Sequence, residues 1–208
     1  MKMIWDISPP VHADSPVFPG DTAYSQNWLT NITDDCPVNV SSITFSPHTG
    51  AHADAPLHYD PQGKAVGMLD LEPYLGRCRV VHAMHVGSKV CMADLTHALQ
   101  DLPPLLLVRT CHAFPLDRFD PQLTAFDAET LEQLVSLGIR LIGIDSASID
   151  PANSKTLPSH QVIRQSNIRV LENLMLDNIP EGDYELIALP LKLMTADASP
   201  VRAILREL

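Results

Sequence analysis

Three of the nine histidines in this 208-residue chain fall within one eleven-residue segment, at His48, His52 and His58. Asp54 lies in the same segment. Imidazole and carboxylate groups are the ligands that zinc, manganese and similar divalent cations accept in proteins. A lone surface histidine is usually idle, but a His-x-Gly-x-His-x-Asp pattern followed four residues later by another histidine is not typical of an idle loop. The segment therefore indicates a metal site.

The spacing within the segment predicts how these ligands converge. His48, His52 and Asp54 are separated by even steps, and residues two apart in an extended chain share a face. We therefore expect all three side chains to project from one side of one strand, with Gly50 leaving room for an ion. A helix would also bring the two histidines together, but Gly50 and Pro56 disfavour a helix. Three protein ligands and a water suffice for a catalytic zinc, and the further candidates favour two ions bridged by a carboxylate.

Strands and helices alternate in the part of the chain that must support this segment. Four apolar runs have the length of buried strands: 77–86, 105–110, 140–144 and 185–190. Three other segments have helical spacing: 92–102, 127–137, and 160–166 with Ser159 as the cap. Asp127 stands at a helix N-cap position, and Gly138 stands where a terminating glycine belongs. The alternation predicts an α/β fold, with a mixed sheet and crossover helices.

The first 60 residues have a different composition, rich in Pro, Ser, Thr and Asp. Proline removes a backbone donor and clashes with the preceding helical turn, so we expect short strands and ordered loops here and no helices. No linker, internal repeat or low-complexity stretch divides the chain. We therefore expect one compact domain over residues 1–208, in which a strand-rich N-terminal portion packs against the sheet.

The composition excludes several classes of partner. The chain is 45% apolar, and 25 acidic residues against 14 Lys and Arg give a net charge of −11. Nucleic-acid phosphates and anionic membrane surfaces both require clustered basic residues, so neither is an expected partner. No apolar stretch approaches the roughly 20 residues of a membrane span. The N-terminus meets Asp6 and two prolines too early for a signal peptide, so we expect a cytoplasmic protein.

The four cysteines are widely separated and form no Cys-x-x-Cys pair. In a cytosolic chain they are expected to be free thiols. Cys111 lies next to His112 and is a weak candidate for a catalytic thiol, because adjacent residues of a strand point to opposite faces.

The histidine segment also carries a family resemblance. His48-Thr49-Gly50-Ala51-His52-Ala53-Asp54-Ala55-Pro56-Leu57-His58 resembles the His-x-Gly-Thr-His-x-Asp-x-Pro-x-His signature of the cyclase-like metal-dependent amidohydrolases. Within that family the chain resembles the bacterial kynurenine formamidases, or arylformamidases, from about residue 4 to residue 195. Further matching segments are 5–9, 16–21, 143–146 and 171–174. The resemblance implies a swivelling β/β/α-like fold. Ala51 departs from the usual Thr, which could remove a hydrogen bond near the metal but removes no ligand.

The resemblance implies a role for each site residue. It implies two Zn²⁺ per subunit, although Mn²⁺, Co²⁺ or Fe²⁺ would suit the same ligands. The implied ligands are His48, His52 and Asp54 for the first ion and His160 for the second, with Asp54 and Glu172 shared. His58 would donate and accept the proton, and Phe18 would contact the substrate. From the residues alone, His160 is a histidine at a helix start and Glu172 is a surface carboxylate.

The implied reaction is the zinc-dependent hydrolysis of N-formyl-L-kynurenine to L-kynurenine and formate, a step of tryptophan degradation. Two alternatives stay open. One is a related metal-dependent hydrolase that acts on another amide, a cyclic imide or a lactam, and the other is a non-catalytic metal-binding module. A serine hydrolase is disfavoured because the chain has no Gly-x-Ser-x-Gly motif. The resemblance also implies a homodimer with a small-molecule substrate.

Overall fold

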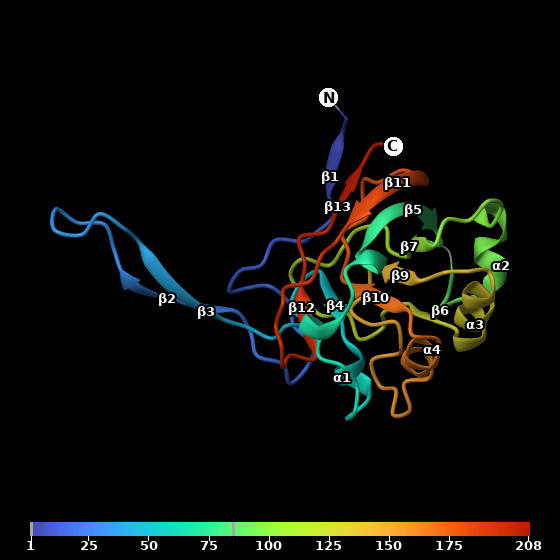
Figure 1. The fold of residues 1–208 in the computed structure, drawn as a ribbon, viewed down its shortest axis with the longest axis horizontal. Coiled ribbons are helices and arrows are strands. Elements are labelled where there is room, and N and C mark those ends of the chain that lie inside the picture. Colours follow the sequence, from blue (N-terminus) through green and yellow to red (C-terminus); the bar gives the residue numbers. More distant parts are fainter. Residues whose placement is uncertain (1, 85) are drawn as a thin grey trace.

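The centre of the fold is a nine-stranded sheet, seen in a computed structural model that describes residues 2–84 and 86–208 (Figure 1). The strand order is β1-β13-β11-β5-β7-β9-β10-β4-β12. The four strands β5, β7, β9 and β10 run parallel to one another, and the other pairings within this sheet are antiparallel. The strands of this sheet are β1 (Ile4–Asp6), β4 (His52–Asp54), β5 (Leu75–His82), β7 (Leu105–Arg109), β9 (Leu141–Ile144), β10 (Arg169–Glu172), β11 (Gly182–Ile187), β12 (Ala198–Pro200) and β13 (Ile204–Arg206).

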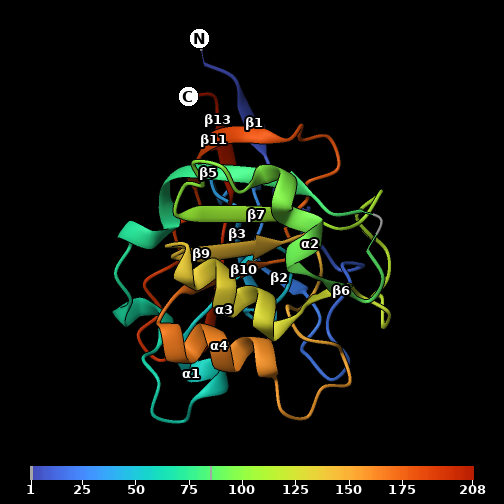
Figure 2. The same ribbon diagram turned by 90° about the vertical axis from the view of Figure 1, so that its right-hand side faces the viewer.

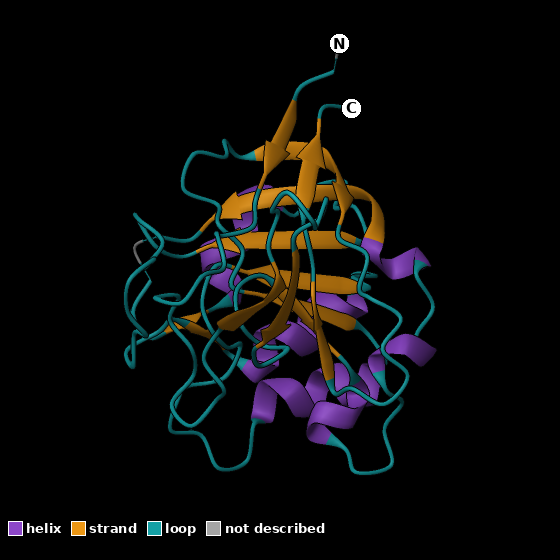
Figure 3. Cartoon of the chain, turned by 90° about the vertical axis from the view of Figure 1, so that its left-hand side faces the viewer, coloured by secondary structure: helices purple, strands orange, loops and turns teal. Residues whose placement is uncertain are grey.

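The helices are short, and two of them cover one face of the sheet. α3 and α4 lie side by side on the side of β9 and β10 (Figure 2), and the opposite side presents the strands of the curled sheet (Figure 3). None of the helices in the described ranges has the length and apolarity needed to cross a membrane. The helices are α1 (Pro56–Tyr59), α2 (Met92–Leu95), α3 (Ala128–Ser136) and α4 (Pro158–Ser166), with 3-10 turns η1 (Val66–Met68), η2 (Glu72–Tyr74) and η3 (Thr96–Ala98).

The apolar runs of the sequence are continuous because the central strands are buried on both faces. On β7, Leu105 and Leu107 point into one core, whereas Leu106 and Val108 point into a second core beneath the helices. Leu131 of α3 packs into this second core. Parallel strands covered on both sides carry apolar residues at every position. The predicted α/β class with a mixed sheet is therefore confirmed, and the four predicted strands correspond to β5, β7, β9 and β11.

One predicted helix is broken. The segment 92–102 has leucines at helical spacing, but it forms only α2 followed by the 3-10 turn η3. The Thr96 hydroxyl donates a hydrogen bond to the Ala93 carbonyl, 3.0 Å away. Such a local bond offers the backbone an alternative to helical hydrogen bonding. Apolar spacing alone therefore overestimated the length of this helix.

The other helix boundaries confirm the predictions in part. α3 begins after Asp127 and is followed by Gly138 at a φ of 95°, as expected. The expectation of no helix before residue 60 was wrong, because Pro56 occupies the first position of α1, where a missing N–H costs nothing. Ser159 is not the cap of α4, which begins at Pro158. Instead, the Ser159 hydroxyl donates to the Phe126 carbonyl at 3.0 Å.

A long hairpin stands apart from the sheet. Within the described residues, β2 (Ser25–Thr30) and β3 (Val40–Thr44) pair only with each other, and they project far from the body (Figure 1). We call residues 22–46 the arm. At its root, the Ser46 amide donates to the Thr22 carbonyl at 2.9 Å. A further two-stranded pair joins β6 (Lys89–Val90) to β8 (Ala125–Phe126).

Candidate metal and active site

Two buried strands and one helix bring four of the expected metal ligands together. His52 and Asp54 share a face of β4, which lies inside the sheet between β10 and β12. Glu172 ends β10 directly opposite His52. His160 comes from the first turn of α4. All four residues are at most 3% exposed, so the fold removes them from water and places them against one another.

His48 reaches the same point by a different route from the one its spacing predicts. The expected single strand over 48–54 is wrong, because β4 begins only at His52 and Gly50 adopts a φ of 68°. A Cβ at Gly50 would lie 2.8 Å from the Val11 side chain, so Gly50 permits a tight turn rather than leaving room for an ion. The turn still carries His48 Nδ1 to within 3.1 Å of Asp54 Oδ1.

Each of the two buried carboxylates faces more than one histidine. Asp54 Oδ1 lies 3.1 Å from His48 Nδ1 and 3.5 Å from His52 Nε2, while Oδ2 lies 3.4 Å from His160 Nε2. Glu172 Oε2 lies 3.4 Å from His52 Nε2, and Oε1 lies 3.7 Å from His160 Nε2. A carboxylate whose two oxygens face different imidazoles has the placement of a bridging ligand.

The chemistry of these atoms fits a divalent cation. His52 Nε2 and Asp54 Oδ1 are buried and have no hydrogen-bond partner among the described residues, and such orphaned atoms are costly unless something binds them. An ion with N and O ligands at about 2.0–2.2 Å lies between atoms that are themselves roughly 3 Å apart. His48, His52 and Asp54 meet this requirement as a group.

Neighbouring groups hold the imidazoles in place. The Asp150 carboxylate lies 2.7 Å from His160 Nδ1 and also accepts the His160 backbone amide at 3.0 Å. On the other side, His52 Nδ1 lies 2.9 Å from the Gly50 carbonyl. Both contacts direct Nε2 of each ring toward the carboxylates, as is usual for histidines that bind metals. The sequence interpretation missed Asp150, which has no distinctive spacing from the histidine segment.

His58 lies at the edge of the cluster, toward solvent. It sits on α1 with one third of its side chain exposed, and its Nδ1 is 3.3 Å from Asp197 Oδ2. The same Asp197 oxygen lies 3.0 Å from His48 Nε2. His58 also lies within ligand distance of Asp54 and His160 as a group. Asp197 was missed as well, since it lies 139 positions after His58 and only the fold brings it there.

The buried charges perturb one another strongly. Burial raises the pKa of the Asp54 carboxyl, but the neighbouring imidazoles of His160 and His48 outweigh burial and hold that pKa well below its usual range. Burial lowers the pKa of both histidines, yet hydrogen bonds to carboxylates raise the pKa of His48 to about 9 and that of His160 to about 10. The Asp54 carboxylate is therefore poised as an anion that attracts cations, as is common at functional sites.

A pocket of about 500 Å³ opens onto this cluster and reaches His48, His58 and Phe18. The Phe18 ring packs edge-on against Phe119, with centroids 4.9 Å apart. Cys111 also lines the pocket, and its thiol donates to Asp145 Oδ2 at 3.0 Å. Burial and the Asp145 charge raise the pKa of this thiol, which opposes formation of a nucleophilic thiolate.

Comparisons with known proteins give the family to which the chain is similar. Residues 5–151 match the model of the Cyclase family. Kynurenine formamidase of Paracidovorax citrulli (strain AAC00-1) is 61% identical over 99% of this chain and 97% of its own, and that of Delftia acidovorans (strain DSM 14801 / SPH-1) is 60% identical over 100% and 99%. A solved structure described as a potential metal-dependent hydrolase with cyclase activity has a TM-score of 0.86 and 27% identity, and the match covers 100% of this chain and 99% of that one.

Proposed function

The chain belongs to the Cyclase family and, within it, to the kynurenine formamidases, and from this premise we propose that it hydrolyses N-formyl-L-kynurenine to L-kynurenine and formate with two bound zinc ions. That the chain is an amidohydrolase follows from the relatives. What we propose is the substrate, the identity and number of the ions, and the role of each residue.

The observation that carries the proposal is the convergence of buried imidazoles on two carboxylates. We assign His48, His52 and Asp54 to the first ion and His160 to the second. Asp54 and Glu172 would be shared, because the two oxygens of each face different histidines at 3.1–3.7 Å. The orphaned His52 Nε2 and Asp54 Oδ1 support this assignment, since the ions would supply their missing partners.

The bound ions would supply an activated water near neutral pH and would polarise the formyl oxygen. The chain itself supplies the proton transfer. Asp197 accepts the Nδ1–H of His58, which leaves His58 Nε2 as the atom that takes the proton of the attacking water. When the C–N bond of the formamide breaks, the same nitrogen gives this proton to the departing aniline nitrogen. An imidazole is suited to both steps near neutral pH.

The pocket walls suit the rest of this substrate. Phe18 and Phe119 offer aromatic edges and faces to the aryl ring, a contact worth about 0.5–1.5 kcal/mol beyond area burial. Kynurenine ends in an amino acid group with charges of both signs. Arg118 lines the pocket, and its guanidinium forms no ion pair among the described residues. We assign Arg118 to the carboxylate, with Asp21 near the ammonium group.

We also propose that the protein works as a twofold homodimer, the commonest closed assembly of identical chains.

The decisive experiment measures formate release by the purified protein, together with its metal content. We expect hydrolysis of N-formyl-L-kynurenine, loss of activity after chelation, and recovery with about two equivalents of zinc. A panel of other formamides, cyclic imides and lactams tests whether the protein is one of the alternative hydrolases. Separate addition of Mn²⁺, Co²⁺ and Fe²⁺ to the chelated protein tests the identity of the metal.

Glu172→Gln is expected to lower the metal content, whereas Glu132→Gln on α3 serves as a matched control. An inactive protein that retains its metal would overturn the proposal.

A further inference from the structure

Leu157 has a backbone conformation that leucine rarely adopts. It lies directly before α4 with a φ of 47° and a ψ of 57°, in the left-handed region, where the Cβ of an L-residue crowds the following carbonyl oxygen. Pro158 follows, and a proline favours an extended conformation in the residue before it. A glycine would make the same turn without this cost. The other non-glycine residues with a positive φ in the described ranges are Asp101, Asn167 and Asn173, whose short polar side chains tolerate this region.

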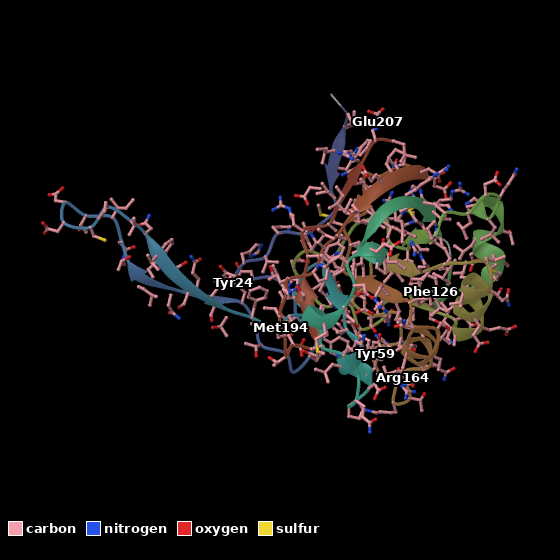
Figure 4. All side chains as sticks on the ribbon, in the orientation of Figure 1. Tyr24, Tyr59, Phe126, Arg164, Met194 and Glu207 are labelled. Carbon is pink, nitrogen blue, oxygen red and sulfur yellow. The ribbon has the colours of Figure 1, made fainter. Side chains whose placement is uncertain are left out.

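Contacts along α4 explain why the chain must turn at this point. At the start of the helix, the Asp150 carboxylate accepts the backbone amide of His160 at 3.0 Å. Farther along, Figure 4 shows Arg164 beside α1, where its side chain donates to Asp60 Oδ2 at 2.8 Å. The helix that carries His160 is therefore fixed in the fold, and the chain that enters it turns at Leu157. A strained conformation persists where the surrounding contacts leave no alternative.

The turn alone does not explain why the residue is a leucine. Leu157 is half-buried, but its side chain packs against neither of the two hydrophobic cores that the described residues form. It lines the pocket of about 500 Å³ instead. Backbone strain of this kind is concentrated at functional sites. The place of this side chain is therefore explained by the pocket and not by the stability of the fold.

Leu157 belongs to the metal end of this pocket. It comes three residues before His160, which is about one helical turn, and His160 lines the pocket as well. Phe18 and Phe119 line both this pocket and a neighbouring hollow, whereas, among the described residues, Leu157 and His160 line only the first. With the aryl ring of the proposed substrate against the two phenylalanines, its acyl group lies at the end of the pocket that Leu157 borders.

We propose that Leu157 is a specificity-determining residue, whose isobutyl group fills the space beside the acyl carbon and admits a formyl group but no larger acyl group. The formyl carbon carries a hydrogen atom where an acetyl carbon carries a methyl group. A close-packed wall has no room for the additional methyl group, and a difference of one methylene changes kcat/KM by about 10- to 200-fold in enzymes. The inference rests on the proposed formamidase reaction.

The test compares two substrates in two variants. The substrates are N-formyl-L-kynurenine and the analogue that carries an acetyl group on the same ring nitrogen, and the release of kynurenine is followed for both. Leu157→Gly and Leu157→Ala are each expected to lower the formyl-to-acetyl ratio of kcat/KM by about 10- to 200-fold, with the metal content of the wild type. Leu137→Gly serves as the control and is expected to leave this ratio unchanged, because Leu137 is an exposed leucine at the end of α3 with an ordinary φ of −83°.

Thermal unfolding separates the backbone strain from the loss of the side chain. Leu157→Gly is expected to leave Tm unchanged or to raise it by a few degrees, because glycine adopts a positive φ freely. Leu157→Ala keeps the Cβ and its strain, so its Tm is expected to be lower than that of Leu157→Gly. Leu137→Gly is expected to lower Tm, since it relieves no strain and gives the unfolded chain more freedom.

The outcomes separate this inference from the proposed function. A wild type that does not hydrolyse the formyl substrate would overturn the proposed function and the inference with it. If the wild type is active, an unchanged ratio in both Leu157 variants, or an equal loss on both substrates, would overturn the role of Leu157 alone. A Leu157→Gly variant that is less stable than Leu157→Ala would contradict the strain on which the inference depends.

Discussion

Asp54 is the side chain on which the site depends most directly. It is 1% exposed, and its two oxygens face three imidazoles. Burying a carboxylate is costly unless opposite charges and hydrogen bonds compensate, and the carboxylates around His48 and His160 raise the pKa of both imidazoles. At the same scale, Asp197 contacts both His48 and His58, so one exposed carboxylate orients a proposed ligand and the proposed proton carrier.

The distinction between ligand and proton carrier is testable at His58. We expect His58→Ala to lower kcat by about 10²–10⁴, the usual contribution of a positioned acid–base group, while the metal content stays close to wild type. Elemental analysis and steady-state kinetics on the same preparation measure both quantities. His97→Ala, at an exposed histidine paired with Glu181, serves as the control. Since His58 lies within ligand distance of Asp54 and His160, a parallel loss of metal would instead make it a ligand.

At the scale of elements, the sheet is the frame that sets the distances in the site. β10 and β4 are antiparallel neighbours, and their register places Glu172 opposite His52. A slip of one residue would turn Glu172 to the other face. Charge also holds the sheet together farther from the site, where β11 pairs with β5. Asp183 of β11 accepts hydrogen bonds from Arg79 at 2.6 Å and from Arg77 at 2.6 Å, both on β5.

The ion pairs of Asp183 predict a pH dependence of stability. The Arg79 guanidinium holds the pKa of the Asp183 carboxyl below its usual range. The stabilisation is therefore present above the unfolded pKa of about 3.9 and is lost as the pH falls through the lower folded pKa. We expect Asp183→Asn to lower the free energy of unfolding by about 1–2 kcal/mol at pH 7. The deficit should shrink below about pH 4. Urea melts from pH 3 to pH 8 measure it, and a deficit of equal size at all pH values would contradict the ion-pair explanation.

At the scale of the whole molecule, the site joins parts of the chain that are remote in sequence. The strand-rich N-terminal portion supplies His52 and Asp54 to the interior of the main sheet, and the helical half supplies His160. The buried cluster therefore lies where these parts meet, so a bound cation would tie them together.

Metal removal should consequently change the stability of the entire protein. A ligand that binds only the folded state stabilises it by about 2.7 kcal/mol at one hundred times its dissociation constant. For a chain of this length, that corresponds to a rise in Tm of roughly 5–10 °C. Calorimetry of chelated and zinc-reloaded protein measures this shift, and Glu172→Gln is expected to reduce it. An unchanged Tm on reloading would contradict metal binding at the buried cluster.

The sequence alone determined the features that depend on neighbouring residues. Apolar runs specify the central strands because those strands are buried on both faces, and Asp127 and Gly138 mark the ends of α3 through local backbone preferences. The pattern from His48 to His58 indicated the metal chemistry, and the resemblance added His160 and Glu172. Only the tertiary structure decided the turn at Gly50, the roles of Asp150 and Asp197, and the projection of the arm. These features depend on contacts between residues far apart in the chain, and no periodicity encodes which distant carboxylate will meet which imidazole.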